Sequence, residues 1–121
     1  MVKSAVITSF LSRTKDRFHE YNDVKNLEER LQMIASMEAI DGVEAVYPYE
    51  VSDAKAVRTL MERYGLQWAA VNANVKAEPE FRAGGVTSTR KEVRDKAVRF
   101  IKEAKDFAKA VGANKVTCCP L

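Results

Sequence analysis

The chain has 121 residues, enough for one domain with a real core, and its content of 46% hydrophobic and 31% charged residues is ordinary for a globular protein. Its 20 basic and 17 acidic residues are interleaved and leave a net charge of +3, which is too mild for a surface that binds nucleic acid. No apolar run approaches the roughly 20 residues of a membrane span, and the N-terminal sequence turns polar too soon for a signal peptide. We therefore expect neither a nucleic-acid nor a membrane partner.

The first predicted unit is a strand followed by a helix. An apolar run at residues 4–11 predicts the strand, and a polar connection follows it. A helix is expected over residues 23–39, where leucine and isoleucine recur at spacings of three and four. Asn26 and Glu29 match a capping box, so the regular part of this helix can begin there.

The second unit repeats the pattern. Residues 42–49 predict a strand that Pro48 ends. Ser52 or Asp53 can cap the helix that follows, and Gly65 suits the C-terminal cap of that helix.

The third unit is followed by one more strand. A strand is expected at residues 66–75, and a glycine-bearing loop follows it. Thr89 and Glu92 predict a second capping box at the start of a long amphipathic helix that Gly112 closes. The fourth predicted strand covers residues 115–121, where the sequence stops as the strand finishes.

Strands that alternate with helices indicate parallel strands joined by right-handed crossovers. We therefore predict a single α/β domain over residues 1–121 with the order β-α-β-α-β-α-β. Two architectures fit: an open doubly wound sheet, and a (β/α)8 TIM barrel cut at its fourth strand. The phosphate-binding fingerprints GxGxxG and GxxxxGK[ST] are missing, which weakens the first.

Three stretches of the sequence resemble one known family. They are DRFHEY at residues 16–21, GVEAVYP at 42–48, and the run from FRAGGVTS to VTCCPL at 81–121. The last is the most specific, with its F-x-x-G-x-x-T-S pattern and a helix ending A-x-G-A before V-T. Together they resemble the N-terminal half of a sugar isomerase/epimerase of the xylose-isomerase-like TIM-barrel superfamily, in the ketose 3-epimerase and rhamnose-isomerase-like branch.

The resemblance implies a parent enzyme that isomerises or epimerises a small carbohydrate such as a ketose. In such an enzyme a proton is removed next to a carbonyl, and a divalent metal, Mn or Mg, holds the sugar oxygens. The family's metal ligands and catalytic glutamates lie on later strands. We therefore assign no catalytic residue and no metal ligand to this chain, and we expect it to bind no cofactor alone. A full barrel has about 250 residues, so the chain corresponds to about half of one.

Candidate substrate contacts lie at the carboxyl ends of the predicted strands and in the loops beyond them, where barrel enzymes build their sites. Asn72 and Asn74 share a strand face and can hydrogen-bond either sugar hydroxyls or loop backbone. Phe81 can wall the pocket or cap the barrel rim. The full predicted set is Phe10, Tyr47, Glu50, Asn72, Asn74 and Phe81.

Two further features carry weaker signals. Glu44 shares a strand face with Val46, and in a closed barrel we expect it to point inward as a hydrogen-bonded anchor. The adjacent Cys118 and Cys119 point to opposite strand faces and are poorly placed to bridge each other, which favours a reducing, cytoplasmic setting. His19, the single histidine, has no companions at metal-ligand spacing.

Two other functions compete with the enzyme fragment. One is a non-catalytic half barrel that forms a homo-oligomer, or joins a separate second half, to cover a bare sheet face carrying Val6, Val46 and Ala70. The other is DNA repair, because the same superfamily includes endonuclease-IV-like enzymes. One histidine and a charge of +3 argue against it, since those enzymes need a histidine and carboxylate cluster and a basic cleft.

Overall fold

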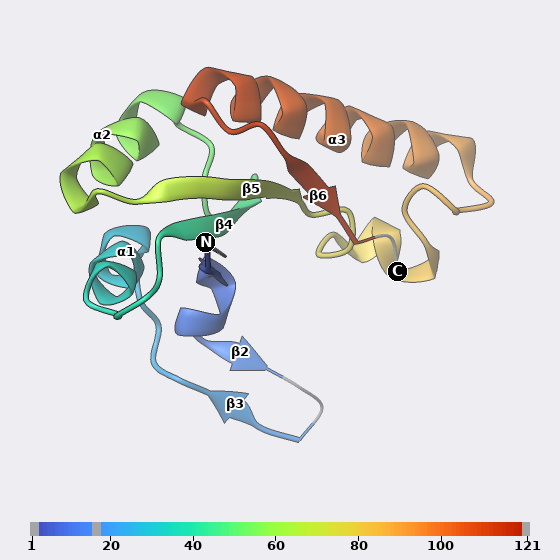
Figure 1. The fold of residues 1–121 in the computed structure, drawn as a ribbon. Coiled ribbons are helices and arrows are strands. Elements are labelled where there is room, and N and C mark those ends of the chain that lie inside the picture. Colours follow the sequence, from blue (N-terminus) through green and yellow to red (C-terminus); the bar gives the residue numbers. More distant parts are fainter. Residues whose placement is uncertain (1–2, 16–17, 120–121) are drawn as a thin grey trace.

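The computed structural model describes residues 3–15 and 18–119 and contains one four-stranded sheet (Figure 1). The strands lie in the order β1 (Ala5–Ile7), β4 (Gly42–Tyr47), β5 (Gln67–Ala73) and β6 (Val116–Cys118). All three strand pairings are parallel. The predicted α/β fold with parallel strands is therefore confirmed, and it corresponds to part of a β/α barrel.

Three helices cover one face of this sheet. They are α1 (Leu27–Ala35), α2 (Ala54–Tyr64) and α3 (Lys91–Val111), the longest, which lies along the sheet in Figure 1. Buried side chains from all three helices pack in one cluster with the sheet; they are Leu31, Ile34, Val43, Ala45, Val57, Met61, Val71, Ala73, Ala104, Phe107, Ala108 and Val111. Right-handed crossovers place consecutive helices on the same side, and the opposite face carries no helix among the described residues.

The helix ends follow most of the local sequence signals. Asn26 Oδ1 accepts from the Glu29 backbone N–H at 2.9 Å, and the Glu29 carboxylate accepts from the Asn26 backbone N–H at 2.7 Å. The first predicted capping box is therefore confirmed. Asp53 caps α2. Gly65 and Gly112 end α2 and α3 with φ of 64° and 79°, values that favour glycine.

The second predicted capping box is wrong. Helix α3 has Arg90 at its N-cap, without a side-chain cap. The Ser88 hydroxyl accepts from the Arg90 N–H at 3.2 Å, and the Arg94 guanidinium donates to the carbonyls of Ser88 and Thr89. These bonds organise the entry to the helix, and the Glu92 carboxylate accepts from Arg90 Nε at 2.7 Å instead of forming a capping box with Thr89.

The chain departs from the predicted strands in the segment after β1. Residues 8–11 form a turn of 3-10 helix, η1 (Thr8–Leu11), because Thr8 turns inward to a buried carboxylate. The predicted polar connection contains a small antiparallel hairpin, β2 (Thr14–Lys15) and β3 (Glu20–Tyr21), that projects away from the sheet (Figure 1).

The remaining differences lie after β5 and at β6. The loop after β5 contains another 3-10 turn, η2 (Pro79–Ala83). Strand β6 is shorter than residues 115–121, and residues 120–121 lie outside the described part.

The register of the strands determines which side chains lie on the sheet face that carries no helix among the described residues, which we call the open face. A register shift after Val43 skips Ala69, which keeps Trp68 on the helix side and places Ala70 and Asn72 on the open face. The expectation that Val6 lies on the open face is wrong: it pairs with Val43 and packs against the helix-covered core.

The open face is also less apolar than expected. Ala70 is only 3% exposed and Val46 is half-buried. Polar side chains from β4, β5 and β6 share this face with them.

Candidate carbohydrate-binding face

The open face carries a polar cluster on three adjacent strands. The Glu44 Oε1 atom accepts hydrogen bonds from Asn72 Nδ2 and from Thr117 Oγ1, both at 2.7 Å. The three side chains come from β4, β5 and β6, and each is half-buried. Strand alternation brings them together, since Glu44 alternates with the helix-facing Val43 and Ala45. The expectation that Glu44 is a hydrogen-bonded anchor is confirmed.

A second polar cluster lies beside the first and is buried. Glu50 Oε2 accepts from Thr8 Oγ1 at 2.6 Å and from the Val46 backbone N–H at 2.9 Å, while Oε1 pairs with the Arg30 guanidinium. The Arg30 and Glu50 side chains are 10% and 11% exposed. This cluster ties η1, α1 and the loop after β4 together. Glu50 is therefore neither a solvated loop carboxylate nor a group open to a ligand in this structure.

The two predicted asparagines have different surroundings. Asn72 belongs to the Glu44 cluster. Asn74 lies beyond the end of β5, where its Oδ1 accepts from the backbone N–H groups of Lys76 and Ala77, each at 2.9 Å. The structure therefore gives Asn74 a loop-bracing role, and it leaves Asn72 on the open face.

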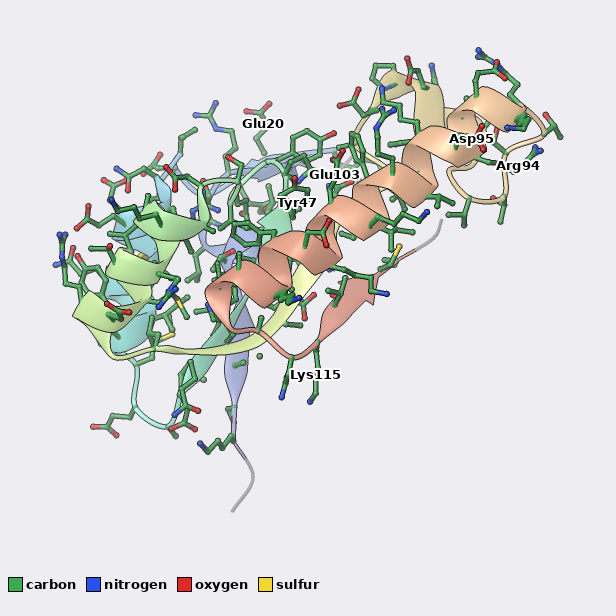
Figure 2. The ribbon with its side chains drawn as sticks, turned by 90° about the horizontal axis from the view of Figure 1, so that it is seen from above. Glu20, Tyr47, Arg94, Asp95, Glu103 and Lys115 are labelled. Atoms are coloured by element: carbon green, nitrogen blue, oxygen red, sulfur yellow. The ribbon has the colours of Figure 1, made fainter. Side chains whose placement is uncertain are left out.

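Tyr47 faces the helices. Its ring packs 5.4 Å from that of Phe107, and Figure 2 shows it beside Glu103 of α3. Burial, with the nearby carboxylates of Glu103 and Asp106, raises the pKa of the Tyr47 phenol. The structure thus places it on the opposite side of the sheet from Glu44.

Phe81 is buried in a small core under η2. It is 3% exposed and stacks edge-on against Phe100 at 5.7 Å, with Val75, Val93 and Ala97 around it. Phe10, in contrast, is 64% exposed on η1. The predicted substrate contacts therefore do not gather at one place, and only Asn72 joins the open-face cluster.

The loops at the carboxyl ends of β4 and β5 are fastened to each other. The Tyr49 hydroxyl donates to Glu78 at 2.6 Å, and Lys96 bridges Glu78 and Glu80. Burial and the hydrogen bond to Glu78 raise the pKa of Tyr49 to about 12. At neutral pH the phenol therefore keeps the proton that makes this bond.

The residues on the open face do not fit a divalent metal. Its donor set is one carboxylate, one amide and one hydroxyl, and the described residues hold no cluster of three or more His, Cys, Asp or Glu side chains suited to a metal ion. Metal sites of this kind need several oxygen or nitrogen ligands converging on one point. We derive no chemical step through a metal on this chain.

Of the two cysteines, Cys118 offers little reactive chemistry. Both are free; Cys119 is exposed, and Cys118 packs partly against the helix side of the sheet. Burial raises the pKa of the Cys118 thiol, with a smaller contribution from Cys119. A raised pKa lowers the thiolate fraction, which is the reactive form.

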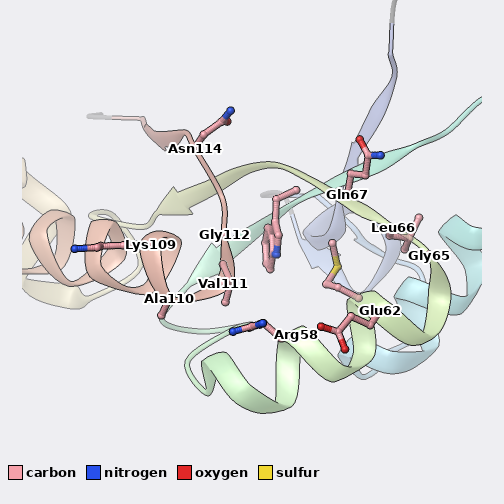
Figure 3. Close-up of a pocket in the computed structure, with 12 residues that line it drawn as sticks. Arg58, Glu62, Gly65, Leu66, Gln67, Lys109, Ala110, Val111, Gly112 and Asn114 are labelled. Atoms are coloured by element: carbon pink, nitrogen blue, oxygen red, sulfur yellow. The ribbon is translucent and has the colours of Figure 1, made fainter.

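A large cavity lies away from both polar clusters. It has a volume of about 630 Å³ between the C-terminal ends of α2 and α3, near the amino end of β5 (Figure 3). Trp68, Arg58 and Lys109 are among its lining residues. Parallel α/β barrels carry their chemistry at the carboxyl ends of the strands, so we do not assign the active face here.

Comparisons with known proteins support the fold. No family model matches the sequence, and no curated protein matches it. Among solved structures, the chain is similar to the crystal structure of AP endonuclease, family 2 from Brucella melitensis, with a TM-score of 0.63 and 20% identity over 96% of this chain. The chain spans 40% of that neighbour's length. At this identity the likeness establishes a shared fold. In addition, no helix among the described residues is long and apolar enough to cross a membrane.

Removing the amide of Asn74 tests its loop-bracing role. We expect Asn74→Ala to lower the free energy of unfolding by about 1–2 kcal/mol, because two backbone N–H groups lose their acceptor. Asn74→Asp keeps that acceptor and serves as the matched control. Urea denaturation measures both variants, and equal stability of Asn74→Ala and the wild type would show that the two bonds contribute nothing.

Proposed function

We propose that this chain is the N-terminal part of a metal-dependent ketose isomerase or epimerase of the xylose-isomerase-like superfamily. In this proposal its open sheet face forms one wall of the carbohydrate pocket. The observation that carries the proposal is the Glu44 cluster, a set of ordered hydrogen-bonding groups on the face that corresponds to a barrel interior. The sequence resemblance and the barrel-like fold support it.

The chain's own residues would bind and orient the sugar rather than move its proton. Glu44, Asn72 and Thr117 offer hydrogen-bonding groups to hydroxyls. A metal bound by the later strands would polarise the carbonyl oxygen when present. The buried Glu50 and Arg30 pair would hold the strand ends in place beneath the pocket.

Assays of the isolated chain form the first test of this proposal. We expect the 121 residues alone to show no isomerisation of a panel of ketoses with Mn²⁺, Mg²⁺ or Co²⁺, because the described residues lack a metal-ligand cluster. Product formation is followed by chromatography. Turnover that survives removal of host enzymes and stops with a chelator would contradict the assignment of the chemistry to later strands.

The same assay is then applied to the product of the complete gene, which we expect to be active. If the reading frame continues into metal-ligand motifs, that product should turn over a ketose in a metal-dependent way. Cleavage of DNA with an abasic site by that product, without action on any ketose, would instead favour the activity that the neighbour is named for, AP endonuclease. A frame that stops at residue 121 would favour the second candidate function.

That second candidate is a half barrel that assembles with itself. It rests on the strand order, which leaves β1 and β6 at the two edges of the sheet. Edge strands present unpaired backbone groups that can bond to another chain. A homo-oligomer could therefore complete the sheet without any catalytic role.

A further inference from the structure

The cavity between α2 and α3 has no part in the proposed function, and its lining combines apolar and charged side chains. Met61 and Val111 are buried, and the half-buried Leu66 and Trp68 complete the apolar part of the lining. The volume of about 630 Å³ lies within the range of about 300–1,000 Å³ that is usual for ligand pockets. The cavity can therefore hold a small organic molecule.

The charges around the cavity favour an anion. Arg58 and Glu62 line it from α2, and Lys109 lines it from α3 (Figure 3). Neither Arg58 nor Lys109 makes an ion pair with another residue in the described part of the chain. A second space, at the amino ends of the strands, adjoins this cavity and shares Trp68 with it. Together the two spaces are lined by four basic and two acidic side chains: Arg58, Lys109, Lys3, Lys115, Glu62 and Asp41. This end of the sheet therefore attracts negative charge.

Trp68 gives the cavity an aromatic surface with an unused hydrogen-bond donor. One side of the Trp68 ring is fixed by Phe107, whose ring lies 6.3 Å away at an angle of 86°. No described residue accepts a hydrogen bond from the Trp68 indole N–H. That N–H is not enclosed either, since no buried polar side-chain atom of the described residues lacks a partner. The indole is thus accessible to a ligand.

The cavity is also independent of whether the sheet is complete. Helices α2 and α3 are consecutive and flank β5, which lies between β4 and β6 in the sheet. Further parallel strands would extend the sheet beyond β6 and would not enter the space between these two helices. A ligand could therefore reach the cavity in a half barrel and in a larger barrel alike.

We infer that the cavity between α2 and α3 binds a small organic anion that carries an aromatic ring. The ring stacks on Trp68 and contacts the thioether of Met61, a group that packs favourably against aromatic rings. The anionic group lies beside Arg58, whose planar guanidinium can donate two parallel hydrogen bonds to it, and Lys109 adds a second positive charge. The site lies at the opposite end of the strands from the proposed carbohydrate pocket, so its ligand is not the substrate of that pocket.

Titration with phenyl phosphate, which has both a ring and a negative charge, tests this inference. Trp68 is the single tryptophan of the chain, so tryptophan fluorescence reports on this cavity alone. We expect a saturable change in the Trp68 emission, with the same Kd by isothermal titration calorimetry. Inorganic phosphate, which lacks the ring, and benzyl alcohol, which lacks the charge, should each bind at least tenfold more weakly.

Four single substitutions of exposed side chains locate the anionic group without disturbing the core. Arg58→Gln should weaken phenyl phosphate binding about tenfold, as expected for losing hydrogen bonds to a charged group. Lys109→Gln should weaken it about threefold, since an exposed charge pair contributes less. Glu62→Gln removes the carboxylate that repels the ligand and should tighten binding. Lys102→Gln is the matched control: it removes the same charge two turns earlier on α3, outside the cavity lining, and should bind as the wild type does.

Each contrary outcome overturns the inference in a defined way. If calorimetry detects no binding of phenyl phosphate at millimolar concentration, the cavity is not a site for such an anion. If phosphate or benzyl alcohol binds as tightly, ring and charge are not recognised together. If Arg58→Gln binds as the wild type does, the anion lies elsewhere. If Lys102→Gln loses as much affinity as Arg58→Gln, net charge alone holds the ligand.

Discussion

Glu50→Gln should lower the free energy of unfolding by about 3–5 kcal/mol, the cost of breaking a buried ion pair by removing one partner. The substitution leaves the Arg30 guanidinium, 10% exposed, without its counter-charge. It also risks placing an amide N–H against the Val46 N–H or the Thr8 hydroxyl, which both donate to this side chain. Chemical denaturation monitored by circular dichroism measures the loss.

Two control variants show whether burial is the cause. Glu80→Gln makes the same change in the exposed pair with Lys96, where the Glu80 side chain is 52% exposed, and should cost less than about 1 kcal/mol. Adding Arg30→Met to Glu50→Gln removes the stranded charge, so the double variant should lose less stability than the sum of the single variants. A Glu50→Gln protein as stable as the Glu80→Gln protein would show that the buried pair contributes no more than a surface pair.

The second large effect concerns self-association. Without further strands, β1 and β6 remain edges and the face with Val46 stays uncovered. Because Val6 packs on the helix side and Ala70 is buried, the apolar part of this face is smaller than the sequence suggested. Covering apolar surface stabilises an association by about 25 cal/mol per Å², and pairing of the two edge strands with another chain would add backbone hydrogen bonds. We therefore expect a homodimer or higher oligomer.

Thermal unfolding at several protein concentrations tests this expectation. Association with another folded chain raises the melting temperature as protein concentration rises. Val46→Lys places a charge on the open face and should abolish that dependence. Val98→Lys, on the exposed side of α3 with Val98 42% exposed, is the matched control and should preserve it. Equal behaviour of the two variants would place any association elsewhere.

Local patterns in the sequence predicted most of the fold. The apolar periodicity, the Asn26 cap, and the glycines at 65 and 112 all act within a few residues, so they can be read without tertiary contacts. The Thr89 and Glu92 motif failed because the Glu92 carboxylate pairs with the Arg90 guanidinium, while the Ser88 hydroxyl accepts from the backbone at the same helix entrance. The hairpin after β1 was missed because its strands are only two residues long.

The sequence predicted the position of a site residue only where strand alternation determines which face of the sheet its side chain lies on. Alternation placed Glu44 on the inward face, where the structure has it, whereas Tyr47, predicted as a substrate contact, faces the helices. It could not name the partners of a side chain, because Thr117 is 73 residues from Glu44 in sequence. Nothing in the sequence marks Arg30 as a buried residue, because an arginine on a helix is usually solvated. Its pairing with Glu50 depends on how α1 packs against the sheet.

Light scattering at micromolar concentration tests most directly whether the open face is part of a barrel interior that needs more strands. The chain has a mass of 13.6 kDa. We predict a particle of at least twice that mass, with the chains meeting at the bare face or at the β1 and β6 edges. A monodisperse particle of one chain that unfolds cooperatively would contradict the half-barrel assignment, and it would favour an open sheet that is complete by itself.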